Sequence, residues 1–159
     1  MPERSDLPGG TVLAFDYGER RIGVAVGECQ IQQAHPLTTL HRSKTDLWTS
    51  IAQLIAEWRP ERLVVGRPVA LDGTPHSQTA RCEHFARQLQ HRFRIVVDYA
   101  EERLSSFDAE QHLRVAGHNA LGARTYLDSV AAQLILQSYF EASTGESGQR
   151  SSPGGNAAQ

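Results

Sequence analysis

Residues 11–26 of the chain read TVLAFDYGERRIGVAV. Two short runs rich in β-branched residues, Thr11–Phe15 and Ile22–Val26, flank an insert whose Asp and Gly are typical of turns. The pattern predicts a β-hairpin at the start of the fold. Ala34–Leu40 is expected to add a third strand at an edge of the sheet, because Pro36 lacks the N–H group that a central strand would use.

Beyond the hairpin, segments with helical periodicity alternate with short apolar runs typical of buried strands. The predicted strands are Arg62–Gly66 and Arg94–Tyr99, and the predicted helices run from Thr45 or Asp46 to about Trp58, from Thr74-Pro75 to about His91, over Ser106–Val115 and over about Leu127–Glu141. Thr74-Pro75 is assigned to a helix start because proline after a capping residue favours the first helical turn.

This order of elements predicts an α/β fold. Three antiparallel strands followed by parallel strands indicate a mixed five-stranded sheet flanked by helices. The ribonuclease H-like fold fits that order best.

The chain has 159 residues, of which 16 are basic and 18 acidic, so its formal net charge is −2. This balance excludes a generally basic nucleic-acid binder but leaves room for a local basic patch. Residues 142–159 contain no Val, Ile, Leu or aromatic residue, which predicts a disordered C-terminal tail. With a shorter flexible segment expected over residues 1–10, one domain is predicted over residues 11–141.

Features of membrane and secreted proteins are missing from the sequence. No apolar run is long enough to span a bilayer, and the N-terminus lacks the pattern of a signal peptide. Cys29 and Cys82 form no closely spaced pair, which favours a reduced protein. We therefore expect a cytoplasmic protein without a membrane partner.

Carboxylates occur where the predicted elements meet. Asp16 follows the first strand, Glu101 and Glu102 follow the last, and Asp128 begins the final helix. Taken singly, these carboxylates are better explained by a turn, an acidic loop and a helix cap, respectively. If the topology brings them together, they repel one another unless a cation lies among them, and Mg²⁺ prefers such oxygen ligands. The hypothesis is a metal site that hydrolyses phosphodiesters.

Arginines accompany these carboxylates. Arg20, Arg21 and Arg103 are their neighbours in sequence, while Arg67 and Arg81 flank the predicted helix start at Thr74-Pro75, where a phosphate could bind. Phosphate contacts and structural ion pairs are both consistent with these positions. The segment 116–126 (AGHNALGARTY) is either a flap over the site or a simple loop.

Several segments, in this order and spacing, resemble the motifs of one family: LAFDYGERRIGVA at 13–25, VGRP at 65–68, DGT at 72–74, TAR at 79–81, EERLSS at 101–106, LDSVAA at 127–132 and ILQSY at 135–139. On these motifs the chain resembles the YqgF family, described as pre-16S rRNA nucleases and as Holliday-junction-resolvase-like proteins. The resemblance spans most of residues 11–141.

The resemblance implies a ribonuclease H-like nuclease that matures the 5′ end of 16S rRNA with Mg²⁺ or Mn²⁺. It makes Asp16, Glu102 and Asp128 the catalytic and metal-binding carboxylates. The family usually has Asp at the position of Glu101, which leaves Glu101 as an alternative ligand. Arg124 stands where the family commonly has Lys, and a role in nucleic-acid binding is expected of it, as of the other arginines.

Other functions remain open at this point. Branched DNA is an alternative substrate, because contacts that recognise the RNA 2′-hydroxyl cannot be read from the sequence. A nucleotide-binding domain like those of actin-like ATPases and sugar kinases shares the Asp-Tyr-Gly hairpin, although the chain is short for two such domains. A non-catalytic, ribosome-associated RNA binder is the third alternative. The ribosome is a further candidate partner, and the chain is expected to be a monomer or homodimer.

Overall fold

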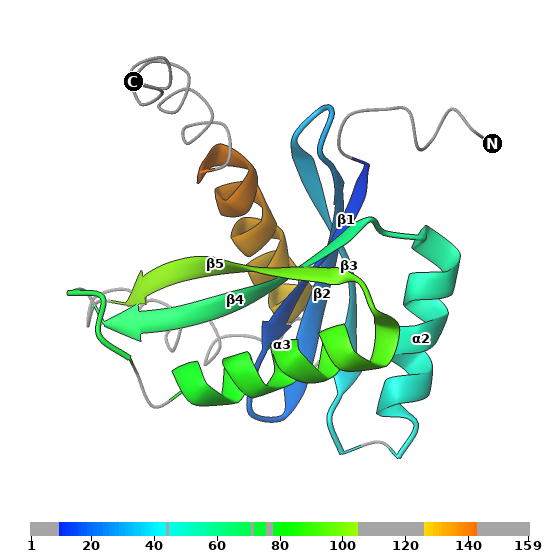
Figure 1. The fold of residues 1–159 in the computed structure, drawn as a ribbon, viewed down its shortest axis with the longest axis horizontal. Helices are drawn as coiled ribbons and strands as arrows, with labels where there is room; N and C mark the ends of the chain where they lie inside the picture. Colours follow the sequence, from blue (N-terminus) through cyan, green and yellow to red (C-terminus); the bar gives the residue numbers. More distant parts are fainter. Residues whose placement is uncertain (1–9, 44, 71, 76–77, 105–125, 143–159) are drawn as a thin grey trace, which may run out of the picture.

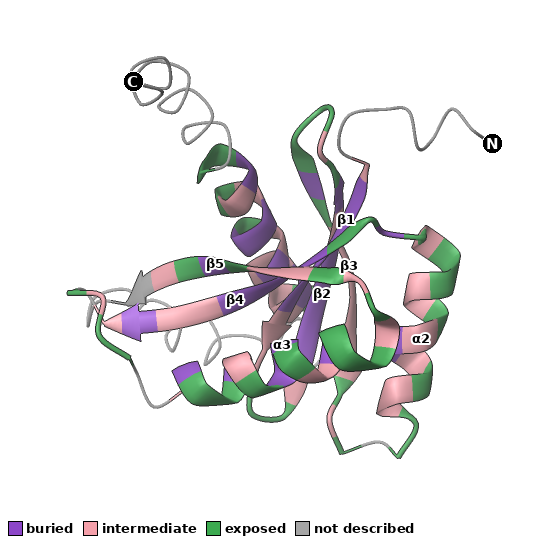
Figure 2. Ribbon diagram, viewed as in Figure 1, coloured by how far each residue is buried: buried purple, intermediate pink, exposed green. Residues whose placement is uncertain are grey.

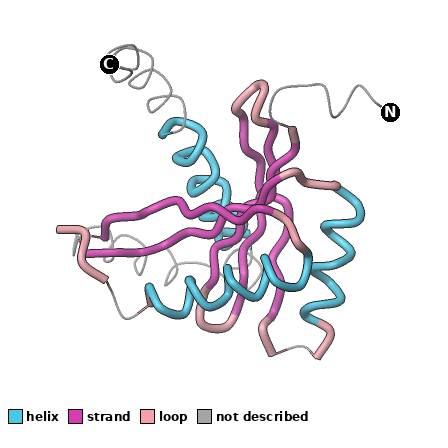
Figure 3. Tube along the Cα trace, viewed as in Figure 1, coloured by secondary structure: helices cyan, strands magenta, loops and turns pink. Residues whose placement is uncertain are grey.

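Five strands form one sheet in the order β3-β2-β1-β4-β5 (Figure 1). The computed structural model describes residues 10–43, 45–70, 72–75, 78–104 and 126–142. Its elements are β1 (Thr11–Tyr17), β2 (Arg21–Glu28), β3 (Gln33–His41), α2 (Leu47–Trp58), β4 (Arg62–Ala70), α3 (Thr79–Phe93), β5 (Val96–Leu104) and a final helix over residues 126–142 (Figure 3).

The strand directions confirm the predicted mixed sheet. β1 is antiparallel to β2, and β2 to β3, whereas β1, β4 and β5 run parallel. β3 is an edge strand as expected, and Pro36 pairs with Ala25 next to a shift in register. The central position of β1 and the order of parallel strands are those of the ribonuclease H-like fold.

Helices cover both faces of the sheet, and the two faces have separate cores (Figures 1 and 2). Alternate residues of a strand point to opposite faces. In β1, Leu13 and Phe15 therefore pack with α2 and α3, while Val12 and Ala14 pack under the final helix. All four side chains are almost fully buried, which makes β1 the centre of a three-layer structure.

The predicted helix start at Thr74-Pro75 is wrong, because α3 begins at Thr79. The Asp72 carboxylate instead accepts hydrogen bonds from the backbone N–H and hydroxyl of Thr74, at 3.0 and 2.7 Å. Pro75 forms an isolated antiparallel bridge with Val69. Thr74 and Pro75 are therefore held by a side-chain turn and by pairing with β4, and they do not begin a helix.

The last two strands are longer than predicted. β4 continues to Ala70 and β5 to Leu104, so Glu101 and Glu102 lie within β5 rather than in a loop after it. The strands pair with each other over their whole length, and this pairing satisfies backbone groups that the sequence pattern assigned to loops.

Other elements agree with the sequence or lie outside the described residues. Helix α2 follows Asp46 as predicted, although the Asp46 side chain makes no capping hydrogen bond. The predicted helix over 106–115, residues 116–125 of the predicted flap, residues 1–9 and residues 143–159 lie outside the described part. Ala142, assigned to the tail, is helical. Within the described part, no helix is long and apolar enough to cross a membrane.

Candidate active site

Asp16 lies near the carboxyl end of β1, on the face of the sheet covered by the final helix. It follows Val12 and Ala14 in the alternation of the strand, and these two pack against that helix. Its antiparallel partner in β2 is Gly23. The carboxylate therefore stands at the end of a rigid, central strand, where parallel sheets commonly bind ligands.

The neighbouring glutamates of β5 point to opposite faces. The Glu101 carboxylate accepts a hydrogen bond of 2.8 Å from the Arg67 guanidinium and is half-exposed. Arg67 also donates to Glu83 of α3, again at 2.8 Å, which assigns Glu101 to the α3 face. Glu102 shares the opposite face with Ala100, whose side chain packs under the final helix. Glu102, and not Glu101, thus lies on the face of Asp16.

Gly66 lies in β4, between the strands that carry Asp16 and Glu102, and the final helix packs closely against it. Phe15 pairs with Val65, and Gly66 pairs with Ala100, so β4 separates the two carboxylate-bearing strands. A Cβ atom on Gly66 would lie 2.6 Å from Cδ1 of Ile135 and 3.7 Å from Oε1 of Glu102. The glycine therefore allows the final helix to approach the sheet, where the Ile135 side chain takes the space that a Cβ atom would need.

The two carboxylates are electrostatically coupled. Burial first, and then the negative charge of Asp16, raise the pKa of Glu102 from 4.5 to about 7. The buried Cys82 thiol of α3 has its pKa raised to about 12, first by burial and then by the charges of Asp16, Glu102 and Glu83. The site is thus a partly desolvated concentration of negative charge.

Asp128 lies in the first described turn of the final helix and binds Arg21. The Arg21 Nε–H donates to Oδ2 of Asp128, and both side chains are about a quarter exposed. A Cβ atom on Gly23 would lie 1.9 Å from the Asp128 carbonyl oxygen, so the helix backbone rests directly on the strand residue that pairs with Asp16. The fold therefore brings Asp128 to the same end of the same face.

The three carboxylates do not form a preformed metal cage in the described structure. Among the residues that the structure describes, no group of three His, Cys, Asp or Glu side chains is arranged to hold a metal ion. Asp16 and Glu102 form a coupled pair, and Asp128 is engaged by Arg21 at the margin.

The other arginines that the sequence predicts to bind nucleic acid differ in exposure and in their ion pairs. Arg20 is exposed in the β1–β2 turn, and Nη1 of the exposed Arg81 lies 3.9 Å from a Glu19 carboxylate oxygen. Arg67 is held by its two glutamates and lies 5.8 Å from the centre of the Tyr99 ring. The side chain of Arg103 and the whole of Arg124 lie outside the described residues. The phosphate site predicted at Thr74-Pro75 has no helix N-terminus to support it.

Sequence reasoning missed the role of Gly23 and Gly66. Both occur inside the motifs quoted above, yet their importance comes from the helix that packs on them from a distant part of the chain. The usable signal was a glycine within a strand, which commonly marks close approach of another backbone.

Comparisons with known proteins show the family to which the chain belongs. A family model described as RuvX, Holliday junction resolvase, matches residues 10–142. A protein of Dechloromonas aromatica is 55% identical over 133 residues, which cover 83% of this chain and 91% of the relative. One of Nitrosomonas europaea is 49% identical over 144 residues, covering 90% and 97%. Both bear the name of a candidate pre-16S rRNA nuclease.

Solved structures of similar fold include two resolvases. RuvC of T. thermophilus in complex with a Holliday junction substrate has a TM-score of 0.47 and 16% identity, with coverage of 85% of this chain and 96% of that one. The fowlpox virus resolvase bound to Holliday junction DNA has a TM-score of 0.49 and 11% identity, with coverage of 83% and 97%.

Proposed function

The chain belongs to the RuvX family of Holliday junction resolvases, the family named YqgF above, and on that premise we propose that it is a metal-dependent nuclease that matures the 5′ end of pre-16S rRNA. Its relatives at about half identity are named for that substrate, and they match it over nearly their whole length. The observation that carries the proposal is the pair of coupled carboxylates, Asp16 and Glu102, on one face of the sheet beside Gly66.

The donor set of this pair fits a hard divalent cation. Mg²⁺ and Mn²⁺ prefer carboxylate oxygens and are commonly held by one or two carboxylates together with water and substrate phosphate. The pKa of Glu102 is raised by burial first and by the negative charge of Asp16 second, so the protein alone disfavours the charged form of Glu102. A cation at this position would remove the repulsion, so Asp16 and Glu102 are its proposed ligands.

The protein residues then have separate roles in hydrolysis. When bound, the metal ion would activate water and stabilise the charge on the departing oxygen. Asp16 and Glu102 would hold this ion, and both belong to paired strands of the sheet rather than to loops. Hydrolysis joins the water oxygen to phosphorus, breaks the bond to the 3′-oxygen and leaves a 5′-phosphate and a protonated 3′-hydroxyl.

Arg21 and Asp128 are proposed to act together at the margin of the site. Their ion pair holds Asp128 at the same end of the sheet face as Asp16 before substrate arrives. A substrate phosphate offers Arg21 a second anionic partner, since a guanidinium can bind phosphate through two N–H groups. Asp128 then becomes available as the third carboxylate of the site.

The remaining arginines are proposed to bind the nucleic-acid backbone. Arg20 and Arg81 are exposed on the turn and helix at this end of the molecule. The proposed backbone-binding arginines also include Arg67, Arg103 and Arg124. We further propose the ribosome as a partner and the cytoplasm as the place of action, with the chain acting as a monomer or homodimer.

Cleavage of branched DNA is the second candidate function, and the description of the family favours it. Precursor 16S rRNA and a four-way DNA junction should therefore be incubated with the same preparation in Mg²⁺, in Mn²⁺ and in EDTA. Cleavage of the precursor alone supports the first proposal, and cleavage of the junction alone supports the second. Cleavage that persists in EDTA would refute metal dependence.

Two neighbouring substitutions provide a matched test of the site. Glu102→Gln should abolish cleavage, because it removes a proposed ligand without changing the shape of the side chain. Glu101→Gln changes the same chemical group one residue away, on the opposite face, and should retain most of the activity. Equal activity of the Glu102→Gln variant and the wild type would refute the site.

A further inference from the structure

The solvent-facing side of α3 carries five exposed basic residues, and a sixth follows directly after the helix. We call these six the basic ridge: Arg81, His84, Arg87, His91, Arg92 and Arg94. The opposite side of the helix packs into the core through residues such as Phe85 and Leu89. The helix is therefore strongly two-sided, with one face apolar and buried and the other basic and exposed.

The positive charge of the ridge is not neutralised along its own helix. Between residues 79 and 94 the only carboxylate is Glu83, whose Oε2 accepts a hydrogen bond of 2.8 Å from Arg67 of β4. The whole chain nevertheless has a net charge of −2. Positive charge is thus concentrated on one helix of an acidic protein, which generates a local field that attracts polyanions.

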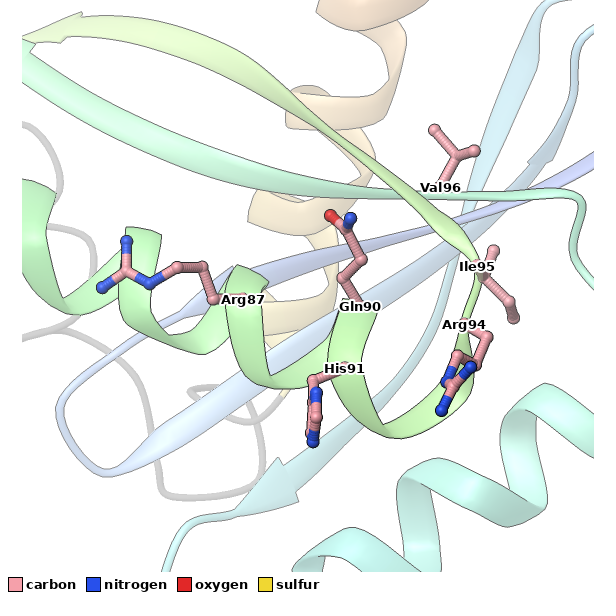
Figure 4. A pocket seen from close by; sticks show the side chains of 6 residues that line it. All are labelled: Arg87, Gln90, His91, Arg94, Ile95 and Val96. Carbon is pink, nitrogen blue, oxygen red and sulfur yellow. The ribbon is translucent and has the colours of Figure 1, made fainter.

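The ridge has the dimensions of a linear binding surface. His84, Arg87, His91 and Arg94 are spaced by three, four and three residues, which places them in one row along the helix. From Arg81 to Arg94 the row extends about 20 Å at 1.5 Å per residue. Figure 4 shows Arg87, His91 and Arg94 beside a hollow that also includes Gln90, Ile95 and Val96.

Its chemistry favours phosphates rather than unpaired bases. Proteins that bind single strands stack bases on exposed aromatic rings, but the aromatic residues of α3, Phe85 and Phe93, are buried or partly buried in the core. Arginine guanidinium groups and imidazole N–H groups donate hydrogen bonds to phosphate oxygens. The Arg92 guanidinium lies 4.2 Å from the centre of the Trp48 ring, which orients it without neutralising its charge.

We propose that the basic ridge binds the phosphate backbone of a double-helical RNA segment outside the cleavage site. The choice of RNA rests on the proposed function. The ridge lies on the α3 face of the sheet, whereas Asp16 and Glu102 lie on the face of the final helix, so the two can be occupied together.

The test is equilibrium binding of an RNA hairpin with a stem of about 16 base pairs in EDTA, where cleavage plays no part. The ridge variant combines Arg87→Gln with Arg94→Gln. The control combines Leu134→Glu with Ser138→Glu, two exposed positions on the final helix at the other face of the sheet. Both double variants lower the net charge by two, and thermal melting establishes that each is folded.

We expect the ridge variant to bind the hairpin about tenfold more weakly at low salt and the control to bind within about twofold of wild type. The slope of log affinity against log salt concentration should fall by about 1 for each lost phosphate contact. Equal affinity of the ridge variant and wild type would overturn the proposal. The proposal would also be overturned if a DNA duplex of the same sequence bound more tightly than the RNA hairpin. It would likewise be overturned if polyglutamate competed for the protein as effectively as RNA does.

Failure of the proposed function gives a different result. If the ridge variant loses RNA binding and the wild type cleaves no RNA, the proposal for the basic ridge stands and the proposed nuclease function fails. If the wild type cleaves RNA and the ridge variant binds RNA as tightly as the wild type, the proposed nuclease function stands and the proposal for the basic ridge fails.

Discussion

Replacing Glu102 by Gln should stabilise the metal-free protein at high pH. The rise in pKa of Glu102 from 4.5 to about 7 means that the folded state disfavours the charged carboxylate. One pKa unit corresponds to about 1.4 kcal/mol, so the charged form is destabilised by about 3 kcal/mol relative to the unfolded chain. Glutamine has nearly the same shape and carries no charge, and therefore avoids this penalty.

The sign of the pH dependence follows from proton binding. Between pH 4.5 and about 7 the folded wild type retains a proton on Glu102 that the unfolded chain releases. The contribution of Glu102 to the free energy of unfolding of the wild type is thus fully present at low pH, and it is lost as the pH rises through that window. The Glu102→Gln variant should equal wild type near pH 4.5 and exceed it by about 3 kcal/mol near pH 8.

Urea unfolding in EDTA, measured across this pH range, gives the free energy of unfolding of each protein. Glu101→Gln is the matched control, because Glu101 is half-exposed and paired with Arg67, and its curve should run parallel to that of wild type. The reasoning is refuted if the Glu102→Gln and wild-type curves are also parallel from low to high pH.

Three further predictions concern packing and reactivity. Gly23→Ala should lower the free energy of unfolding by about 3 kcal/mol and reduce cleavage, because the added Cβ would displace the backbone at Asp128. Urea unfolding measures the first effect, and an RNA cleavage assay measures the second. Cys82, with a pKa of about 12 and a buried side chain, should react with iodoacetamide more slowly than Cys29, as followed by mass spectrometry. Tyr139→Phe should lower the unfolding free energy by about 1 kcal/mol, because the hydroxyl makes two side-chain hydrogen bonds. An unchanged value for either substitution, or faster reaction of Cys82, would contradict these expectations.

Most of the sheet could be predicted because its strands have local signatures. The hairpin, the edge strand with Pro36 and the start of β4 at Arg62 all follow from alternation, turn residues and β-branched runs. The errors occurred where distant pairing outweighs local preference. Thr74-Pro75 resembles a helix start, but its backbone pairs with β4 instead.

The candidate site was predicted in its residue types but not in its geometry. Two adjacent glutamates at a strand end are expected to point in different directions, but their spacing did not decide which of them shares the face of Asp16 before the length of β5 was known. The sequence also contained no signal for the contact between Arg21 and Asp128, which are 107 residues apart.

The sequence by itself determined the order of strands and helices, and with it the sheet topology, because strand and helix periodicities are local properties of the chain. It also placed Asp16 directly after the first strand, which the structure extends to Tyr17. Only the tertiary structure decided that Glu102 joins Asp16 across Gly66, and that Asp128 is held by Arg21. Those outcomes depend on the register of β5 and on the docking of the final helix, which bring together atoms that no local pattern connects.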